Sequence, residues 1–510
     1  MFDLGTSFAA SVDRDPHALA IVDGGTRLTY GAWYERISAL VSGLEEMGLG
    51  RGDHVLTAMQ NRWENASLHW ACQFLGIIVT PLNWRAKADE VDHAIADSGA
   101  KAVFYEDVTE EAVATSAEAA GLVRKSATEL ATMMQAEAPL ALPQASADDW
   151  SLMLYTSGTT SRPKGVPRRH RAERAGALAH VAQNLYRHGE RTLGVMPLYH
   201  TMGVRSLIAS SLIGGAFICL PRFDAGKAID LIEAEGITNL YLVPTLYHDV
   251  VHHENFSPER VKSVTKLGYA GASMTDGLLR KLDDAFKPEL FVNHYGSSEI
   301  YTFSIDQKAA LKPGSAGRAG INQMIRVAKL NAASPDELAE TGEEGEIIAL
   351  AKSDEAFEGY WNRPEATQKA LRNGWYFTGD TGFFDKDGDL FVTGRADDMI
   401  ITGGENVSPV EVESCLSLHD NVAEVAVVGL PDQRWGKIVT AFVKRRGDVT
   451  AEELDQHCKT SGLANFRRPR RIVFVEDIPK SPVGKILRRL LVAGDYREEQ
   501  RAPKITKHTA

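Results

Sequence analysis

The chain has 510 residues, which is too many for a single hydrophobic core, so we expect two or more domains. Its apolar content of 44% and charged content of 24% are ordinary for a globular enzyme or binding protein. The formal net charge of −12 argues against a general nucleic-acid binder, because such binding depends on neutralising phosphates.

The cysteines and the apolar stretches indicate a reduced, cytoplasmic setting. The four cysteines show neither the short spacing of a zinc site nor the density of a disulfide framework: Cys72, Cys219, Cys415 and Cys458. No basic segment followed by an apolar one opens the chain, so we read no secretory signal. The apolar stretch 206–220 is too short for a bilayer span of about 20 residues and predicts a buried helix followed by a strand.

Short β-branched runs alternate with helical patterns along most of the chain. Strands are predicted near residues 54, 101, 216 and 238, with amphipathic segments between them, which favours an α/β fold with parallel sheets. Residues 225–235 have apolar side chains at helical spacing, and Gly236 follows as a helix stop. The Ala-rich stretch 114–149 predicts a helix and an exposed connector.

The charge pattern changes near residue 394. After residue 395 there are 18 Lys and Arg against 17 Asp and Glu, whereas the preceding residues hold 38 against 51. A glycine and a charged cluster in "GRADDMI" also interrupt two apolar strands there. We therefore predict one domain over 1–394 and a second over 395–510.

The segment 155–170, "YTSGTTSRPKGVPRRH", places a loop rich in Gly and hydroxyl groups between a predicted strand and a predicted helix. Such a loop can cradle phosphates with its backbone N–H groups, and a surface turn is the alternative. It is not the common P-loop, because Lys164 precedes Gly165. For Arg168 and Arg169 we favour a solvated helix start over contact with phosphate.

The same loop resembles the signature of the acyl-adenylate-forming superfamily, which includes acyl-CoA ligases, peptide-synthetase adenylation domains and firefly luciferase. Six further motifs follow in the family's order: "MPLYH" (196–200), "GYAGASM" (268–274), "HYGSSE" (294–299), "GWYFTGD" (374–380), "GRADDMIITGGENVSPVEVE" (394–413) and "PKSPVGKILRR" (479–489). The resemblance implies a large N-terminal domain of two α/β sheets plus a β-barrel-like subdomain, and a small, mobile α+β C-terminal domain.

The resemblance implies an ATP site. Phosphates would be held by the loop residues Thr156, Ser157, Gly158, Thr159, Thr160 and Lys164. Adenine and the remaining nucleotide would contact Gly271, Ala272, Tyr295, Gly296, Ser297 and Ser298. Asp380 would accept hydrogen bonds from both ribose hydroxyls, and Arg395 would reach the ribose or the phosphate region. Glu299 would ligate Mg²⁺, although a helix cap is the alternative role for that carboxylate.

The resemblance also implies two half-reactions in one site. Lys485 would stabilise the transition state of adenylation, and the small domain would then rotate about Asp397 so that a thiol can reach the acyl-adenylate. The thiol is expected to be coenzyme A, held by charge and stacking at Arg85, Gly403, Gly404, Trp435, Phe466, Arg468 and Arg470.

Among members of the family the chain looks most like bacterial aryl-CoA ligases of the 4-chlorobenzoate type. That likeness assigns His200 a catalytic role beside the carboxylate, and it assigns an acyl pocket to His200, Thr201, Met202, Tyr241, His294 and Tyr301. These side chains are more polar than a halobenzoate needs, so we expect a ring with hydrogen-bonding groups or a heteroaromatic acid. Their bulk disfavours a long acyl tunnel.

The sequence thus predicts an ATP-dependent ligase that activates an aromatic or heteroaromatic acid and transfers it to CoA. Alternatives are a medium-chain or alicyclic acyl-CoA synthetase, an enzyme that loads a carrier protein, and a noncatalytic binder. The presence of Lys485, Glu299 and Asp380 together disfavours the last of these. We expect no nucleic-acid or membrane partner, and a homodimer is left open.

Overall fold

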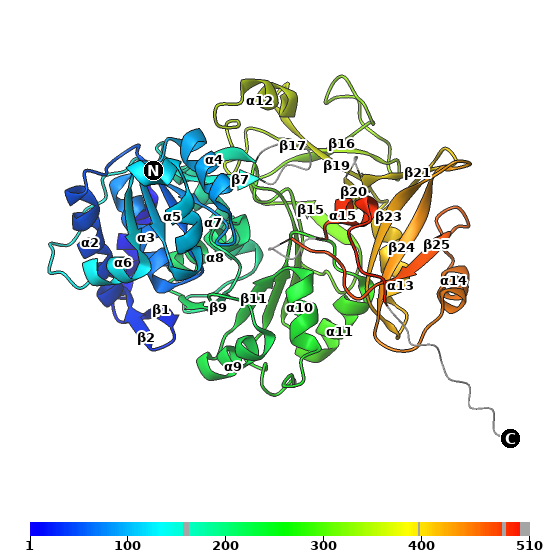
Figure 1. The fold of residues 1–510 in the computed structure, drawn as a ribbon, viewed down its shortest axis with the longest axis horizontal. Helices are drawn as coiled ribbons and strands as arrows, with labels where there is room; N and C mark the ends of the chain where they lie inside the picture. The colour runs from blue at the N-terminus through cyan, green and yellow to red at the C-terminus, as the bar shows by residue number, and fades with distance from the viewer. Residues whose placement is uncertain (157–162, 396–397, 482–485, 500–510) are drawn as a thin grey trace.

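The computed structural model describes residues 1–156, 163–395, 398–481 and 486–499. Within these residues the strands form sheets of six, fourteen and five strands (Figure 1). The first two sheets belong to the large N-terminal part of the chain, and the strands of the third follow Arg395.

The six-stranded sheet is parallel apart from its last strand. Its order is β6-β5-β3-β4-β7-β8, and β8 runs antiparallel to β7. The strands are β3 (His54–Ala58), β4 (Ile78–Pro81), β5 (Ala102–Tyr105), β6 (Val123–Ser126), β7 (Trp150–Thr156) and β8 (Lys164–Arg169).

The fourteen-stranded sheet has a parallel part and an antiparallel part. The parallel part comprises β1 (Leu19–Asp23), β9 (Arg191–Gly194), β10 (Ala216–Cys219), β11 (Asn239–Leu242), β12 (Lys266–Tyr269) and β13 (Leu290–Tyr295), with β2 (Thr26–Thr29) antiparallel at its edge. The antiparallel part comprises β14 (Ser304–Asp306), β15 (Ser315–Ala319), β16 (Ile325–Ala328), β17 (Gly345–Leu350), β18 (Leu371–Arg372), β19 (Trp375–Phe384) and β20 (Leu390–Arg395). Strands β14 and β15 connect the two parts, so the expected barrel-like subdomain continues the α/β sheet.

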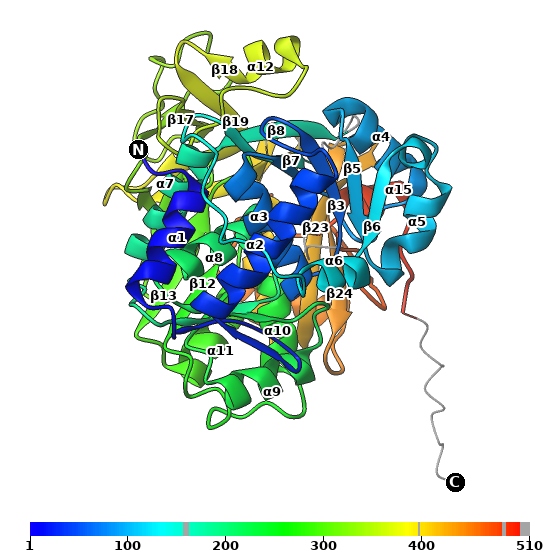
Figure 2. The same ribbon diagram turned by 90° about the vertical axis from the view of Figure 1, so that its left-hand side faces the viewer.

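Helices cover both faces of the six-stranded sheet and of the parallel part of the larger sheet. They are α1 (Leu4–Arg14), α2 (Tyr30–Glu46), α3 (Trp63–Leu75), α4 (Ala88–Ser98), α5 (Glu110–Thr115), α6 (Ala127–Met133), α7 (His170–Gln183), α8 (Thr201–Leu212), α9 (Ala225–Glu235), α10 (Pro244–Val251), α11 (Asp276–Phe286) and α12 (Pro364–Ala370). Figure 2 shows α1, α2 and α3 side by side. Their apolar side chains share one core with α8 and with strands of both sheets, whereas α9 to α11 cover the opposite face of the larger sheet.

The predicted α/β elements are confirmed, including the helix over residues 225–235, which is α9. Asp224 caps this helix by accepting a hydrogen bond from the Lys227 N–H at 2.8 Å. Gly236 ends it with φ of 59°, a conformation that glycine adopts without a Cβ clash. The apolar stretch 206–220 is also the predicted buried helix, α8, followed by β10.

The small C-terminal part is a five-stranded α+β unit, as the resemblance implied. Its strands are β21 (Ile400–Thr402), β22 (Glu405–Val407), β23 (Val422–Asp432), β24 (Gly436–Arg445) and β25 (Arg471–Phe474). Its helices are α13 (Pro409–Ser417), α14 (Ala451–Thr460) and α15 (Arg488–Ala493). The described part of the chain has no helix with the length and apolarity that a bilayer crossing requires.

The segment around the phosphate-binding motif differs from the predicted order of strand, loop and helix. Strands β7 and β8 form an antiparallel hairpin in which Thr156 pairs with Lys164, and α7 begins only at His170. The second strand forms because residues 164–169, "KGVPRR", pair with β7 along its length. A side chain at Gly165 would place its Cβ 2.8 Å from the Met153 sulfur, so glycine permits the close approach of the two strands.

The interpretation of Arg168 as a solvated residue is wrong. Its guanidinium has an exposed fraction of 0%, forms an ion pair with Glu173 at 2.8 Å and stacks on the Tyr301 ring at 4.1 Å. Arg169 instead stacks on Trp150 and pairs with the exposed Glu358. Both arginines therefore have partners within the protein, and neither reaches toward a phosphate through these contacts.

Removing the charge of Glu173 tests the Arg168 pair. The Glu173→Gln variant leaves a buried guanidinium without its counter-ion, so we expect the free energy of unfolding to fall by about 3–5 kcal/mol. Urea unfolding followed by tryptophan fluorescence measures the change. Glu259→Gln is the matched control, because Glu259 pairs with Lys262 where both side chains are over 70% exposed, and it should cause no measurable change. If both variants lowered the free energy of unfolding by the same amount, Glu173 would not be the counter-ion on which buried Arg168 depends.

The two parts of the chain meet where α11 approaches α13 and where α10 ends. A Cβ at Gly277 would lie 2.8 Å from the Ser417 carbonyl oxygen, so the backbones are close there. At the end of α10, His252 Nδ1 donates to the His248 carbonyl at 2.8 Å, and Arg446 Nη2 donates to His252 Nε2 at 3.2 Å. The contact therefore uses the neutral imidazole of His252. Burial and the nearby His248, Lys281 and Arg446 lower the pKa of His252 to about 4.

This contact predicts a pH-dependent domain arrangement. The pKa of His252 is lower in the folded contact than its ordinary value near 6.5, so the contact is fully favourable above pH 6.5 and weakens as the pH falls toward 4. We expect fluorescence energy transfer between dyes on the two domains to change over this range. His252→Gln should flatten the change and His253→Gln should not; an identical pH profile in all three proteins would contradict the role of His252.

Candidate active site

The predicted nucleotide motifs follow two neighbouring parallel strands. Gly271 and Ala272 follow one residue after β12, and Gly296 to Glu299 come directly after β13. The carboxyl ends of parallel strands meet at one edge of a sheet, which is where ligands bind in open α/β folds. Gly296 cannot carry a side chain here, because its Cβ would lie 2.1 Å from the Tyr301 carbonyl oxygen.

The predicted ribose-binding residues lie beside the predicted adenine contact. The Tyr295 hydroxyl donates to Asp380 Oδ2 at 2.7 Å. Asp380 and Arg395 are cross-strand partners on β19 and β20, and Arg395 Nη1 lies 3.6 Å from Asp380 Oδ1. Burial, and then the Asp380 carboxylate, raise the pKa of Tyr295 well above its ordinary value, so the hydroxyl stays protonated and donates. The structure thus brings Tyr295, Asp380 and Arg395 together.

The predicted metal ligand Glu299 is joined to the phosphate-motif lysine by a residue that the sequence analysis missed. Tyr360 donates its hydroxyl to Glu299 Oε1 at 2.7 Å, and Lys164 Nζ lies 4.1 Å from the centre of the Tyr360 ring. Glu299 Oε2 has no hydrogen-bond partner within the described ranges. A carboxylate oxygen held in this way suits Mg²⁺, which prefers hard oxygen ligands. Tyr360 lies in a connecting segment without a motif, so no sequence signal marked it.

Several predicted residues lie outside the described part of the chain. These are the phosphate-motif residues Ser157, Gly158, Thr159 and Thr160, the hinge residue Asp397 and the catalytic Lys485. Thr156 and Lys164, which flank the motif, are paired partners where β7 ends and β8 begins.

The predicted acyl-pocket residues converge from three elements. His200 caps α8, where its Nδ1 accepts a hydrogen bond from the Met202 N–H at 3.3 Å, and Thr201 begins the helix. Tyr241 on β11 and His294 on β13 have ring centroids 4.9 Å apart. All except His200 are buried, and His200 is half-buried.

Buried polar side chains behind this pocket are a feature that the sequence analysis missed. Arg205 on α8 is 2% exposed and donates to the Tyr301 carbonyl at 3.2 Å, to Thr302 Oγ1 at 3.0 Å and to the Tyr241 hydroxyl. The Tyr301 hydroxyl donates to Glu173 at 2.9 Å and is therefore engaged inside the protein. The one available signal was a charged residue within the apolar pattern of "MGVRSLIAS".

Part of the predicted CoA set forms one cluster on the small domain. Gly403 donates its N–H to the Trp435 carbonyl at 2.9 Å, and a Cβ at Gly403 would lie 2.8 Å from the Trp435 ring. The guanidinium of Arg470 lies 4.2 Å from the centre of that ring. Of the other predicted residues, Gly404 follows Gly403 and has a φ of 90°. Phe466 contacts the Arg467 guanidinium, and Arg468 donates a hydrogen bond to Asn465. Arg85 lies in the N-terminal part, where it stacks on Trp84.

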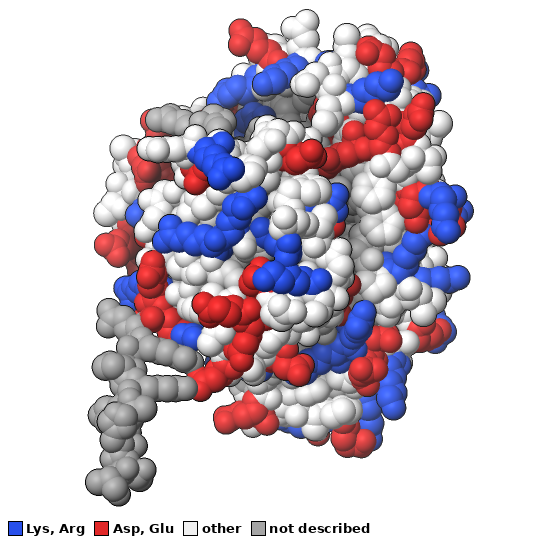
Figure 3. All heavy atoms as spheres, turned by 90° about the vertical axis from the view of Figure 1, so that its right-hand side faces the viewer, with Lys and Arg blue, Asp and Glu red and all other residues white. Residues whose placement is uncertain are grey.

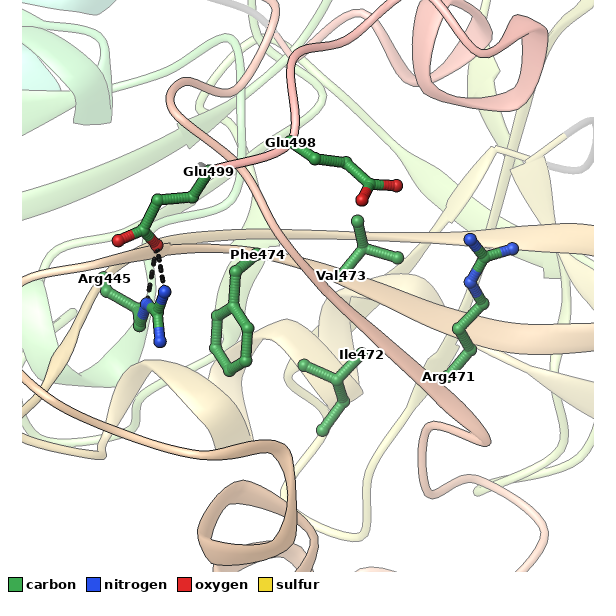
Figure 4. Close-up of a pocket in the computed structure, with 7 residues that line it drawn as sticks. All are labelled: Arg445, Arg471, Ile472, Val473, Phe474, Glu498 and Glu499. Carbon is green, nitrogen blue, oxygen red and sulfur yellow. Dashed lines mark hydrogen bonds and ion pairs between the residues drawn. The ribbon is translucent and has the colours of Figure 1, made fainter. Parts of the chain in front are cut away.

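Elsewhere, most of the charged side chains lie near side chains of opposite charge. Figure 3 shows Lys and Arg gathered across the middle of the face formed by the small domain, with acidic side chains around them. A pocket of about 260 Å³ lies on β24 and β25, and there Arg445 pairs with Glu499 while Arg471 and Glu498 lie on the opposite side (Figure 4). Asp385, Asp387 and Asp389 form an acidic group, but Lys312 Nζ binds all three carboxylates.

The chain is similar to known proteins along most of its length. The family model "AMP-binding enzyme" matches residues 8–361, and "AMP-binding enzyme C-terminal domain" matches residues 411–485. A 4-chlorobenzoate–CoA ligase of Arthrobacter sp. is 36% identical over 95% of this chain and 93% of that protein. A long-chain-fatty-acid–CoA ligase of Mycobacterium tuberculosis is 33% identical over 96% and 98%, respectively. The crystal structure of ATP-bound MatB from Rhodopseudomonas palustris superposes with a TM-score of 0.87 at 28% identity, covering 97% of this chain and 99% of that one.

These matches span nearly the whole chain and define an AMP-forming acid–thiol ligase. The chain belongs to the family of AMP-binding enzymes, which confirms the resemblance seen in its motifs.

The Tyr360 hydroxyl offers a test of the Glu299 site. We expect Tyr360→Phe to lower the apparent affinity for Mg²⁺ during ATP binding by about tenfold to a hundredfold, because the hydroxyl orients the carboxylate that is predicted to ligate the ion. Calorimetric titration of ATP at a series of Mg²⁺ concentrations measures this. Tyr34→Phe is the control, since the Tyr34 hydroxyl donates to the Ala141 carbonyl at 2.5 Å outside this site. An unchanged Mg²⁺ dependence in Tyr360→Phe would remove Tyr360 from the site.

Proposed function

We propose that this ligase activates an aromatic or heteroaromatic carboxylic acid as its acyl-AMP, with release of pyrophosphate, and then transfers the acyl group to coenzyme A. One observation carries the proposal. The nucleotide residues Tyr295 and Glu299 and the buried polar side chain of His294 all belong to β13 or the turn that follows it. A nucleotide held by the first two would therefore have its α-phosphate close to an acid held beside the third.

Charge neutralisation is the main task of the nucleotide end, because the reaction joins two anions and releases a third. Lys164 supplies a cation at the start of β8, and Lys485 supplies a second in this proposal. Glu299 would hold Mg²⁺ through Oε2, and that ion would neutralise phosphate oxygens when bound. Tyr360 keeps the Glu299 carboxylate in one orientation by donating to Oε1.

The ribose end depends on the two oxygens of Asp380. Each can accept one hydrogen bond from a ribose hydroxyl, and Tyr295 and Arg395 already hold the carboxylate in place. A fixed ribose orients the α-phosphate toward the acid, which lowers the entropic part of the barrier. His200, at the start of α8, is proposed to orient the carboxylate of the acid.

The second half-reaction needs access for a thiol. We propose that the domain 395–510 rotates about Asp397, which withdraws Lys485 and brings Gly403 and Trp435 toward the acyl-adenylate. The close packing of Gly403 on the Trp435 ring supports a narrow path for a pantetheine arm. Arg468 and Arg470 would contact the phosphates of CoA, and Arg85 would contact them from the N-terminal part. A cytoplasmic location follows from the use of ATP and CoA.

The aryl acid is preferred over a long acyl chain because Tyr241, His294 and Tyr301 close the pocket with rings that are at most 3% exposed. The similarity to a long-chain-fatty-acid–CoA ligase keeps an aliphatic substrate as the second candidate. If the substrate is aliphatic, we propose a medium-chain or alicyclic acid, because a short pocket would not admit a long acyl chain. Transfer to a carrier protein is the third, and the arginine and tryptophan cluster on the small domain favours free CoA over it.

A panel of carboxylic acids assayed for ATP–pyrophosphate exchange, and then for CoA thioester, tests the proposal. Benzoates and furoates should support exchange with a higher kcat/KM than alicyclic, medium-chain and long-chain acids. Exchange with the aliphatic acids alone would overturn the aryl assignment, and exchange without thioester from CoA would favour the carrier-protein alternative.

The two-conformation scheme gives a separate prediction for Lys485. Lys485→Ala should reduce pyrophosphate exchange by about a thousandfold, a loss typical of removing one transition-state charge contact, and should leave conversion of supplied acyl-AMP to thioester within about twofold. Lys480→Ala is the matched control in the same segment, because Lys480 pairs with Glu424 within the small domain. Equal loss of both half-reactions in Lys485→Ala would contradict the scheme.

A further inference from the structure

A buried polar cluster lies behind the predicted acyl pocket and is more elaborate than a pocket for an apolar ring requires. It consists of His180 and Asn184 on and after α7, Arg205 on α8, Tyr241 on β11 and His294 on β13, each at most 2% exposed. Buried polar groups are costly unless they are hydrogen-bonded, so the unpaired atoms of this cluster indicate what is missing from it.

The hydrogen bonds of Asn184 determine which ring nitrogen of each histidine carries a proton. Asn184 Nδ2 lies 2.7 Å from the His180 carbonyl oxygen, which can only accept, so this atom is the amide nitrogen. The same Nδ2 lies 3.0 Å from His180 Nδ1, which must therefore accept. Asn184 Oδ1 lies 3.0 Å from His294 Nε2, so His294 Nε2 carries a proton and donates.

It follows that one ring nitrogen of His294 can accept a hydrogen bond but has no donor in the described part of the chain. With its proton on Nε2, a neutral His294 has a lone pair on Nδ1, and that atom is buried without a partner in the described part of the chain. Burial and the positive charge of Arg205 hold the pKa of His294 well below its ordinary value, so the imidazole remains neutral. A donor is the missing partner at this point.

Tyr241 presents the complementary group. Arg205 Nη2 donates to the Tyr241 oxygen, so the phenol accepts there and its own proton remains to be donated. Among the described residues no acceptor lies within hydrogen-bond reach of that proton, and no carboxylate lies within ion-pair distance of Arg205. A guanidinium that polarises the phenol makes it a stronger donor. An acceptor is the missing partner here.

We propose that Tyr241 and His294 select carboxylic acids whose ring carries a hydroxyl group. A hydroxyl is both donor and acceptor, so one substituent would accept from the Tyr241 phenol and donate to His294 Nδ1. Arg205 and Asn184 act as positioning residues that set the polarity of these two groups. The inference rests on the proposed function, because it assigns the substrate class of the same site.

The cluster also predicts which analogues are rejected. A ring with hydrogen, methyl or halogen at that position leaves both buried groups unpaired, and sites built to bind a hydroxyl discriminate strongly against analogues that lack it. A methoxy substituent accepts a hydrogen bond but donates none, so it satisfies Tyr241 and leaves His294 Nδ1 unpaired. The order of kcat/KM should therefore be hydroxyl, then methoxy, then methyl or hydrogen.

The test is pyrophosphate exchange with benzoate and with its 2-, 3- and 4-hydroxy, methoxy and methyl derivatives. At one ring position the hydroxy acid should exceed the methyl acid in kcat/KM by at least tenfold. Tyr241→Phe removes the phenol oxygen and keeps the ring, so it should reduce this ratio at least tenfold, with the larger loss of kcat/KM for the hydroxy acid. His294→Phe should remove the preference for hydroxy over methoxy.

The outcomes separate this inference from the proposed function. If benzoate derivatives are activated but no hydroxy acid is preferred, or if Tyr241→Phe lowers kcat/KM for hydroxy and methyl acids equally, the hydroxyl assignment is overturned and the aryl-CoA ligase proposal stands. If no benzoate derivative supports exchange while an aliphatic acid does, both are overturned. Thermal unfolding of each variant should show a single cooperative transition well above the assay temperature, so that a lost preference reflects the site and not an unfolded protein.

Discussion

The hydrogen bond from Tyr295 to Asp380 is the contact on which the proposed nucleotide site depends. Tyr295 ends β13, the last parallel strand of the large sheet, and Asp380 lies on β19 in the antiparallel part. The two residues are 85 positions apart in the sequence and meet because β14, β15 and β20 continue the sheet between their strands. One continuous sheet thus carries both sides of the site, and its hydrogen-bonded registers fix their separation.

Buried charged side chains next to this site stabilise its geometry. Arg168 reaches from β8 to the Glu299 carbonyl at 2.9 Å and pairs with Glu173, which in turn accepts from Tyr301. The backbone of the proposed metal ligand is therefore tied to the hairpin that carries the phosphate motif. Buried ion pairs add little net stability, but they impose a particular geometry. Here that geometry holds Lys164, Tyr360 and Glu299 in one group.

The sequence predicted those helices and strands that are marked by residues within or next to them. Helix α9 follows from its apolar spacing and Gly236, and the early strands follow from β-branched runs between helical patterns. The motif residues Tyr295 and Asp380 were placed in one site by resemblance, and the structure brings them together.

Long-range partners explain what the sequence did not reveal. Arg168 was read as solvated because arginine usually is, and its burial depends on Glu173 and Tyr301 meeting it in three dimensions. The β7–β8 hairpin was missed because a Gly-rich loop before a helix has the same local pattern. Tyr360 and Arg205 acquire their roles only through Glu299 and Tyr241, and no spacing along the chain encodes those pairs.

The central claim is that nucleotide and aromatic acid occupy one continuous site whose two ends are built on β13. Its most direct test is the affinity for an unreactive analogue of hydroxybenzoyl-AMP in which a sulfamoyl group replaces the phosphate, measured by calorimetry beside AMP and the free acid. Because one molecule engages both ends, its Kd should be about a hundredfold or more below that of AMP. A Kd no lower than that of AMP would contradict a shared site.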